Sequence, residues 1–179
     1  MKIKSLLLLG AFLLCSNSVF ALNIDIYANH LNNNGGGSPY SGLVGSFQSP
    51  DIMFGYNWHP YGLGVYGADI TGYLDVSNSG SYLFDLASDD GSLLLIDSLL
   101  VVNNGGPHGP RDAFGTASLT AGLHPFEVQF YEDFGGPGGV NLYLPQGVTY
   151  GATPTPEPAT MFLLGIGLLG LVGFKKKRK

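Results

Sequence analysis

The sequence predicts an all-β protein folded as an antiparallel β-sandwich, and three observations support this fold class. From Asn23 onward, apolar and polar residues alternate with a period of two, which is typical of half-buried strands. Turn-forming groups separate these runs, and the 179-residue chain contains 28 glycines. Outside its two ends, the chain shows no helical stripe of apolar residues. Short strands with frequent turns favour a sandwich or a barrel.

Residues 1–21 are predicted to form a helical secretory signal peptide. Lys2 and Lys4 make a basic start, residues 6–14 make an apolar run, and cleavage is expected after Ala21. The apolar run is too short to span a bilayer, which argues against the alternative of an uncleaved anchor. The only cysteine, Cys15, would leave with this peptide, so the exported domain would contain no disulfide.

The domain itself is expected to cover residues 22–147. Two runs that are apolar on both faces, 93–96 and 99–102, flank Asp97-Ser98 and predict a hairpin buried in the centre of the sandwich. Segments 32–37 and 103–112 are expected to be surface loops. The inward residues of the other predicted strands are, in order, Ile24 and Ile26; Ile70, Leu74 and Val76; Tyr82, Phe84 and Leu86; Phe126, Val128 and Phe130; and Val140, Leu142 and Leu144.

A Pro/Thr linker over 148–155 is expected to lead to a three-part tail over 156–179. The tail begins with Pro156-Glu157-Pro158, continues with an apolar run over 160–174 and ends in the basic cluster 175–179. A helix over the apolar run would be only about 22 Å long. It could just cross a ~30 Å hydrocarbon core, with the basic end on the cytoplasmic side. A plain tail anchor is the alternative use of such a segment.

The order of these three parts closely resembles the PEP-CTERM sorting signal of Gram-negative bacteria that make exopolysaccharide. The resemblance implies that an exosortase cleaves the chain near Pro156, Glu157 and Pro158. The precursor would then sit only transiently in the inner membrane, and the mature protein would be secreted or transferred to the cell surface.

Removal of both ends leaves a strongly acidic domain. Between residues 22 and 155 the chain has twelve acidic residues and one basic residue, Arg111, which is a net charge of −11. A surface of this kind repels nucleic acid and anionic lipid, so neither is an expected partner. It attracts cations instead.

The middle of the chain resembles the PA-fourteen domain, which is named after the protective-antigen fragment. The resemblance rests on SGSYLFDLASDDGSLLLID, LLVVNNGGPHG, ASLTAGLHPFEVQFYED and GVNLYL, and it covers roughly residues 43–144. It implies a β-sandwich module of the kind used in adhesins, glycosidases and toxins. The glycine usual after the I-D pair of this family is Ser98 here, which leaves the turn type of the hairpin open.

The adjacent aspartates Asp89 and Asp90 are the main candidate site. They can hold one ion only if both side chains face the same way, which a cis peptide bond allows. Asp89 and Asp90 match the pair through which flocculin-type adhesins of this family bind calcium, and that calcium also helps to hold sugar hydroxyls. The resemblance implies further ligands from a later loop, where Glu132, Asp133 and Asn141 are candidates. The alternative is that both aspartates only cap turns.

Other candidate residues are few. Phe54, Tyr56 and Trp58 alternate onto one face, where Trp58 is a candidate sugar-stacking residue and core packing is the alternative. The histidines show no zinc-ligand spacing and are expected in loops or at the surface: His30, His59, His108 and His124.

The chemistry of an enzyme is not apparent in the sequence. The exported part of the chain has no G-x-S-x-G, P-loop or cysteine nucleophile. Neighbouring carboxylates cannot easily flank a glycosidic bond at the ~5–9 Å separation that hydrolysis needs, which argues against a glycosidase. The sequence therefore predicts an exported, non-enzymatic protein that binds extracellular polysaccharide with the help of calcium. A structural matrix protein without a defined glycan ligand is the alternative.

Overall fold

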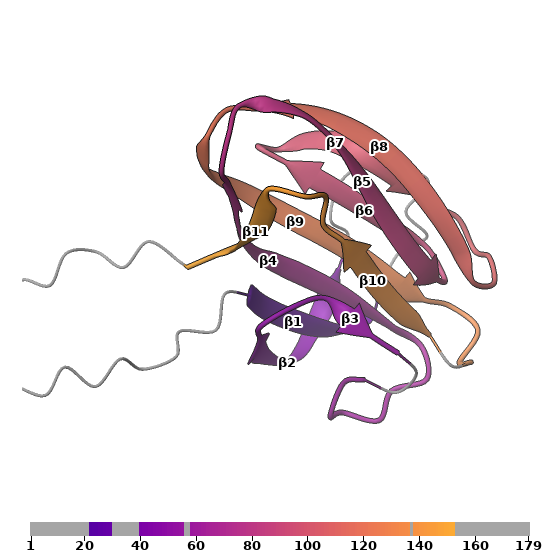
Figure 1. The fold of residues 1–179 in the computed structure, drawn as a ribbon. Coiled ribbons are helices and arrows are strands. Elements are labelled where there is room, and N and C mark those ends of the chain that lie inside the picture. Colours follow the sequence, from indigo (N-terminus) through magenta and orange to yellow (C-terminus); the bar gives the residue numbers. More distant parts are fainter. Residues whose placement is uncertain (1–21, 30–39, 56–57, 137, 153–179) are drawn as a thin grey trace, which may run out of the picture.

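The computed structural model describes residues 22–29, 40–55, 58–136 and 138–152, and these form two antiparallel β-sheets packed face to face (Figure 1). The predicted all-β antiparallel fold is therefore confirmed. The predicted signal peptide and sorting tail lie outside the described residues. Within the described residues, no helix is long and apolar enough to cross a membrane.

The larger sheet has seven strands and the smaller sheet has four. In the larger sheet, the order is β2 (Ser41–Ser49), β1 (Leu22–Asn29), β4 (Tyr66–Val76), β9 (Gly122–Glu132), β6 (Ser92–Ile96) and β7 (Leu99–Asn104), while β11 (Val148–Gly151) pairs with the C-terminal part of β4. In the smaller sheet, the order is β3 (Met53–Phe54), β10 (Gly139–Tyr143), β5 (Gly80–Asp89) and β8 (Arg111–Leu119).

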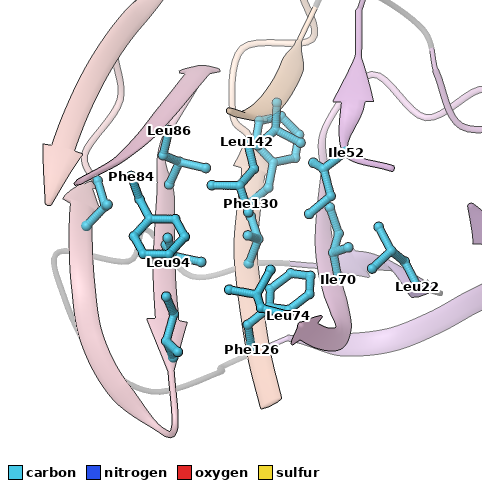
Figure 2. Close-up of a cluster of buried hydrophobic side chains, with 14 of the residues drawn as sticks. Leu22, Ile52, Ile70, Leu74, Phe84, Leu86, Leu94, Phe126, Phe130 and Leu142 are labelled. Carbon is cyan, nitrogen blue, oxygen red and sulfur yellow. The ribbon is translucent and has the colours of Figure 1, made fainter. Parts of the chain in front are cut away.

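The core lies between the two sheets and is built from the inward residues of the alternating runs (Figure 2). The larger sheet contributes residues such as Ile70, Leu74 and Phe130, and the smaller sheet contributes Phe84 and Leu142. Each of these side chains is almost completely buried, as the period-two pattern predicted. A Leu or Phe buried in this way stabilises the fold by about 1.5–3 kcal/mol relative to an exposed one.

The hairpin of β6 and β7 forms as predicted, but it is not at the centre of the sandwich. β7 is the last strand of the larger sheet, and Leu99 is 70% exposed. Asp97 and Ser98 both have positive φ, at 51° and 65°. A two-residue turn with positive φ at both positions fits the right-handed twist of the flanking strands. Asp97 therefore acts as a turn former.

Two further expectations about loops and boundaries were wrong, and strand β2 was missed. The predicted linker starts too early, because 148–151 is strand β11. The segment 103–112 is not wholly a surface loop, since Asn104 ends β7 fully buried and Arg111 begins β8. Strand β2 was not predicted, because its small and polar residues give a weak alternation.

Candidate metal site at Asp89 and Asp90

The Asp89–Asp90 pair lies at the end of β5, where the chain crosses to β6 in the other sheet. The peptide bond between the two residues is cis. Glu132 ends β9, the neighbour of β6, and so reaches the same edge of the sandwich. One carboxylate oxygen from each of the three residues lies within 4.8 Å of the others. These residues form what we call the carboxylate triad.

Asp90 ties together three separate parts of the chain. Its side chain is only 2% exposed, and both of its oxygens accept hydrogen bonds from backbone N–H groups. Oδ1 accepts from His108 at 2.9 Å, and Oδ2 accepts from Asp133 at 2.9 Å. The turn-capping role considered from the sequence is therefore present, and it links two distant loops.

Glu132 organises the loop that follows β9. Its Oε1 accepts hydrogen bonds from the backbone N–H groups of Phe134 at 3.1 Å and Gly136 at 3.2 Å. The backbone of Gly138 approaches the triad so closely that a Cβ there would overlap the Glu132 carboxylate. The absence of a side chain at Gly138 allows the backbone to pass close to the Glu132 carboxylate.

The triad brings three carboxylates together, of which Asp90 and Glu132 are buried and Asp89 is partly buried. Burial raises the pKa of Asp89, and the neighbouring Asp90 raises it further, while His108 acts in the opposite direction. Burial also raises the pKa of Glu132, to which Asp90 and Asp89 add, against the two loop N–H donors. A divalent cation would relieve this repulsion, and three carboxylates supply the hard oxygen donors that calcium prefers. The donor set therefore fits calcium.

The other two metal-ligand candidates lie nearby in different roles. Asp133 follows Glu132 directly, and its backbone N–H bonds to Asp90. Asn141 lies on β10 opposite Ala87 and lines a pocket of about 520 Å³ together with Asp89. Glu132, the residue that completes the triad, was among the sequence candidates.

A second pocket, of about 430 Å³, opens directly onto the triad. Its wall includes Pro107, His108, Gly109 and Phe134. The Phe134 ring is 76% exposed, although a phenylalanine usually lies inside a protein. Sequence reasoning missed Phe134, because its position in FGGPGG gives no strand pattern; its nearness to Glu132 was the only signal.

Trp58 does not stand free at the surface. Its ring stacks on Phe54, with 4.2 Å between ring centroids and 10° between planes, and it also contacts Phe47, Tyr66 and Phe130. These contacts place Trp58 against the core, which is the alternative considered from the sequence. Tyr56 lies outside the described residues.

Two histidines expected at the surface are buried instead. His59 is packed against Tyr66 in the same aromatic cluster, and His124 bonds through Nδ1 to the Asp97 carboxylate at 2.7 Å. His124 also contacts the backbone carbonyl of Thr120. Both rings therefore support the fold. His30 lies outside the described residues, and His108 lies in a loop as expected.

A buried polar network that the sequence did not predict stands behind the triad. The Asn104 side chain donates to the carbonyls of Leu86 and Arg111 and to Ser88 Oγ, and it accepts from Arg111 Nε. Its backbone carbonyl contacts His108 Nε2 at 2.8 Å. Asn104 thereby joins β5, β7 and β8. It also holds the loop that contains His108, whose backbone N–H donates to Asp90.

Comparison with known proteins agrees with the fold. Residues 32–152 match the PA14 domain, and residues 154–179 match the PEP-CTERM protein-sorting motif. The chain belongs to the PA14 domain family. A search of curated proteins gave no match.

Solved structures similar to this chain include both binding and enzymatic proteins. One is a PA14 sugar-binding domain from an RTX adhesin, with 19% identity and a TM-score of 0.55 over 71% of this chain and 91% of that chain. Another is the A domain of epithelial adhesin 6 from Candida glabrata in complex with Galβ1-3GlcNAc, with 14% identity and a TM-score of 0.54 over 77% of this chain and 83% of that chain. A third is a β-glucosidase from Kluyveromyces marxianus, with 15% identity and a TM-score of 0.54 over 74% of this chain but only 17% of the enzyme.

Proposed function

We propose that this PA14 domain binds carbohydrate with the help of a calcium ion held by the carboxylate triad. The observation that carries the proposal is the convergence of three carboxylates, from Asp89, Asp90 and Glu132, at one open pocket. Two of the similar structures are named as a sugar-binding domain or contain a bound disaccharide. That likeness supports carbohydrate as the class of ligand.

The residues around the triad suit a sugar. A bound calcium would supply coordination positions for two hydroxyl groups of the ligand, since calcium accepts six to eight oxygen ligands. The exposed ring of Phe134 offers an aromatic face at the same pocket, on which the C–H face of a sugar ring can pack. The neighbouring loop is held in place by its bonds to Asp90 and Glu132.

Glycan-array binding measured in millimolar calcium and again in chelator tests this proposal. We expect saturable binding to a restricted set of glycans in calcium and its loss in chelator. Phe134→Ala should weaken the same binding about tenfold, because it removes the stacking surface but no calcium ligand. Leu123→Ala, which shortens an exposed apolar side chain on β9, is the matched control and should bind as wild type. Binding that is equal with and without calcium would contradict the proposal.

We further propose that the domain is exported and that an exosortase releases it from the inner membrane. After release, the domain would meet extracellular polysaccharide. The match of residues 154–179 to the PEP-CTERM motif supports this route. Replacing Pro156, Glu157 and Pro158 with alanine should leave the precursor in the inner membrane, as fractionation and immunoblotting would show. Normal release of that variant would contradict the sorting assignment.

A binding role fits the site better than a catalytic one. The triad oxygens lie within 4.8 Å of one another, whereas two carboxylates that hydrolyse a glycosidic bond flank it on opposite sides. A matrix protein that attracts cations without a defined glycan is the second candidate, and the net charge of −11 over residues 22–155 favours it. Saturable, chelator-sensitive binding separates the two.

A further inference from the structure

The outer face of the smaller sheet carries a row of three side chains that the triad does not use. Tyr143 on β10 pairs with Asp85 on β5, and Asp85 pairs with Phe114 on β8. Phe114 is 61% exposed and Tyr143 is 45% exposed, so both rings face outward. Two strand spacings separate the Cα atoms of Tyr143 and Phe114 by about 10 Å.

Asp85 lies between the two rings, in the middle strand of the three. Its Oδ1 is buried and has no hydrogen-bond partner among the described residues. Directly opposite residues of paired strands have their Cβ atoms ~5 Å apart, so both aromatic residues are immediate neighbours of this carboxylate. Burial raises the pKa of Asp85, and Asp112 adds to the effect. The row therefore places a partly buried carboxylate between two exposed aromatic rings.

This face is continuous with the triad. The next row toward it consists of Asn141, Ala87 and Asp112, which are again register partners across the same three strands. All three residues line the pocket of about 520 Å³, and Asp89 lines it too. A ligand that begins at Asp89 can therefore extend along this surface to the Tyr143–Asp85–Phe114 row.

We infer that the outer face of the smaller sheet binds internal sugar units of a neutral polysaccharide chain. The C–H faces of sugar rings pack on aromatic rings, whose faces carry partial negative charge, and sugar hydroxyls are donors for a carboxylate. Asp85 and Asp112 would repel an acidic polysaccharide at close range. The inference rests on the proposed function for the class of ligand, and it adds the neutral charge and the chain-internal mode of binding.

Titration of full-length protein, in mild detergent, with two kinds of probe tests the inference. The polymers are laminarin, hydroxyethylcellulose and galactomannan as neutral chains and alginate as an acidic chain; the short probes are the monosaccharides of each neutral chain. The test variant is Phe114→Thr with Tyr143→Thr, because threonine suits exposed strand positions. Leu123→Thr on the larger sheet is the matched control. Asp89→Asn reports on the triad separately.

We expect the double variant to bind at least one neutral polymer about 100-fold more weakly, roughly tenfold for each ring, while its binding of short sugars stays unchanged. Equal polymer affinity of wild type and double variant, with binding that chelator and Asp89→Asn still remove, would overturn this inference and leave the proposed function standing. Polymer binding that survives chelator but is lost in the double variant would support the inference and contradict the calcium site. A preference for alginate would overturn the inference in favour of an acidic ligand. A dimer that forms in the wild type and is lost in the double variant would overturn it in favour of a second copy of the chain. No glycan binding by the wild type would overturn both.

Discussion

In millimolar calcium, the exported form, residues 22–155, should melt about 10 °C higher than in chelator. The reason is that calcium would bind only the folded triad, and a ligand at 100 times its dissociation constant stabilises a protein by ~2.7 kcal/mol. For a domain of this size, each kcal/mol corresponds to roughly 3–5 °C in melting temperature. The chain has no disulfide in this range, so nothing covalent masks the effect. Differential scanning calorimetry measures it directly.

Two controls separate a bound ion from general screening of negative charge. Magnesium at the same concentration should raise the melting temperature far less, since magnesium demands octahedral geometry and gives up its water reluctantly. Asp75→Asn removes one charge from an exposed position on β4 and should keep the full calcium shift. If magnesium raises the melting temperature as much as calcium does, or if calcium does not raise it, the proposed calcium site is contradicted.

Asp90→Asn should destabilise the domain by about 1–3 kcal/mol even in chelator, whereas Asp89→Asn should not. Both oxygens of Asp90 accept backbone N–H bonds, so an amide NH₂ at either position would face another donor in a nearly closed site. Asp89 is only partly buried, so an amide there leaves the two loop contacts intact. Chemical denaturation of both variants in chelator gives the comparison.

The same pair of variants in calcium distinguishes a metal site from a turn cap. If the triad holds calcium, Asp89→Asn should lose most of the calcium-dependent rise in melting temperature while keeping the wild-type stability in chelator. If the aspartates only shape the loops, Asp89→Asn should match the wild type under both conditions. Asp90→Asn alone does not separate these explanations, because the residue contributes to both.

Period-two alternation was sufficient to predict the sandwich and most of its core. Residues such as Ile70, Phe84 and Val128 are nearly fully buried, as their alternation implied. The pairing of Asp89 with Asp90 was also visible in the sequence, since adjacent acidic residues at a strand end are conspicuous. The resemblance to the PA14 family then implied calcium as the ion that this pair would bind.

The remaining features depend on contacts that no local pattern records. β7 is apolar on both faces in the sequence, yet it is an edge strand, because strand order is set by pairing across the whole chain. Asn104 looked like a loop residue because asparagine and glycine surround it, but four hydrogen bonds hold its side chain inside. The Tyr143–Asp85–Phe114 row comes together from positions far apart in the sequence, so only the fold reveals it.

Arg111, the one basic residue between positions 22 and 155, uses its guanidinium within the chain, where it donates to Asn104 and to the carbonyl of Gly105. Neighbouring copies of the domain would therefore all present negative charge and repel one another. At physiological ionic strength the repulsion between such bodies acts over about 8 Å, and it reaches further as salt is diluted. The distance that two copies keep from one another would therefore widen at low ionic strength and shorten at high ionic strength.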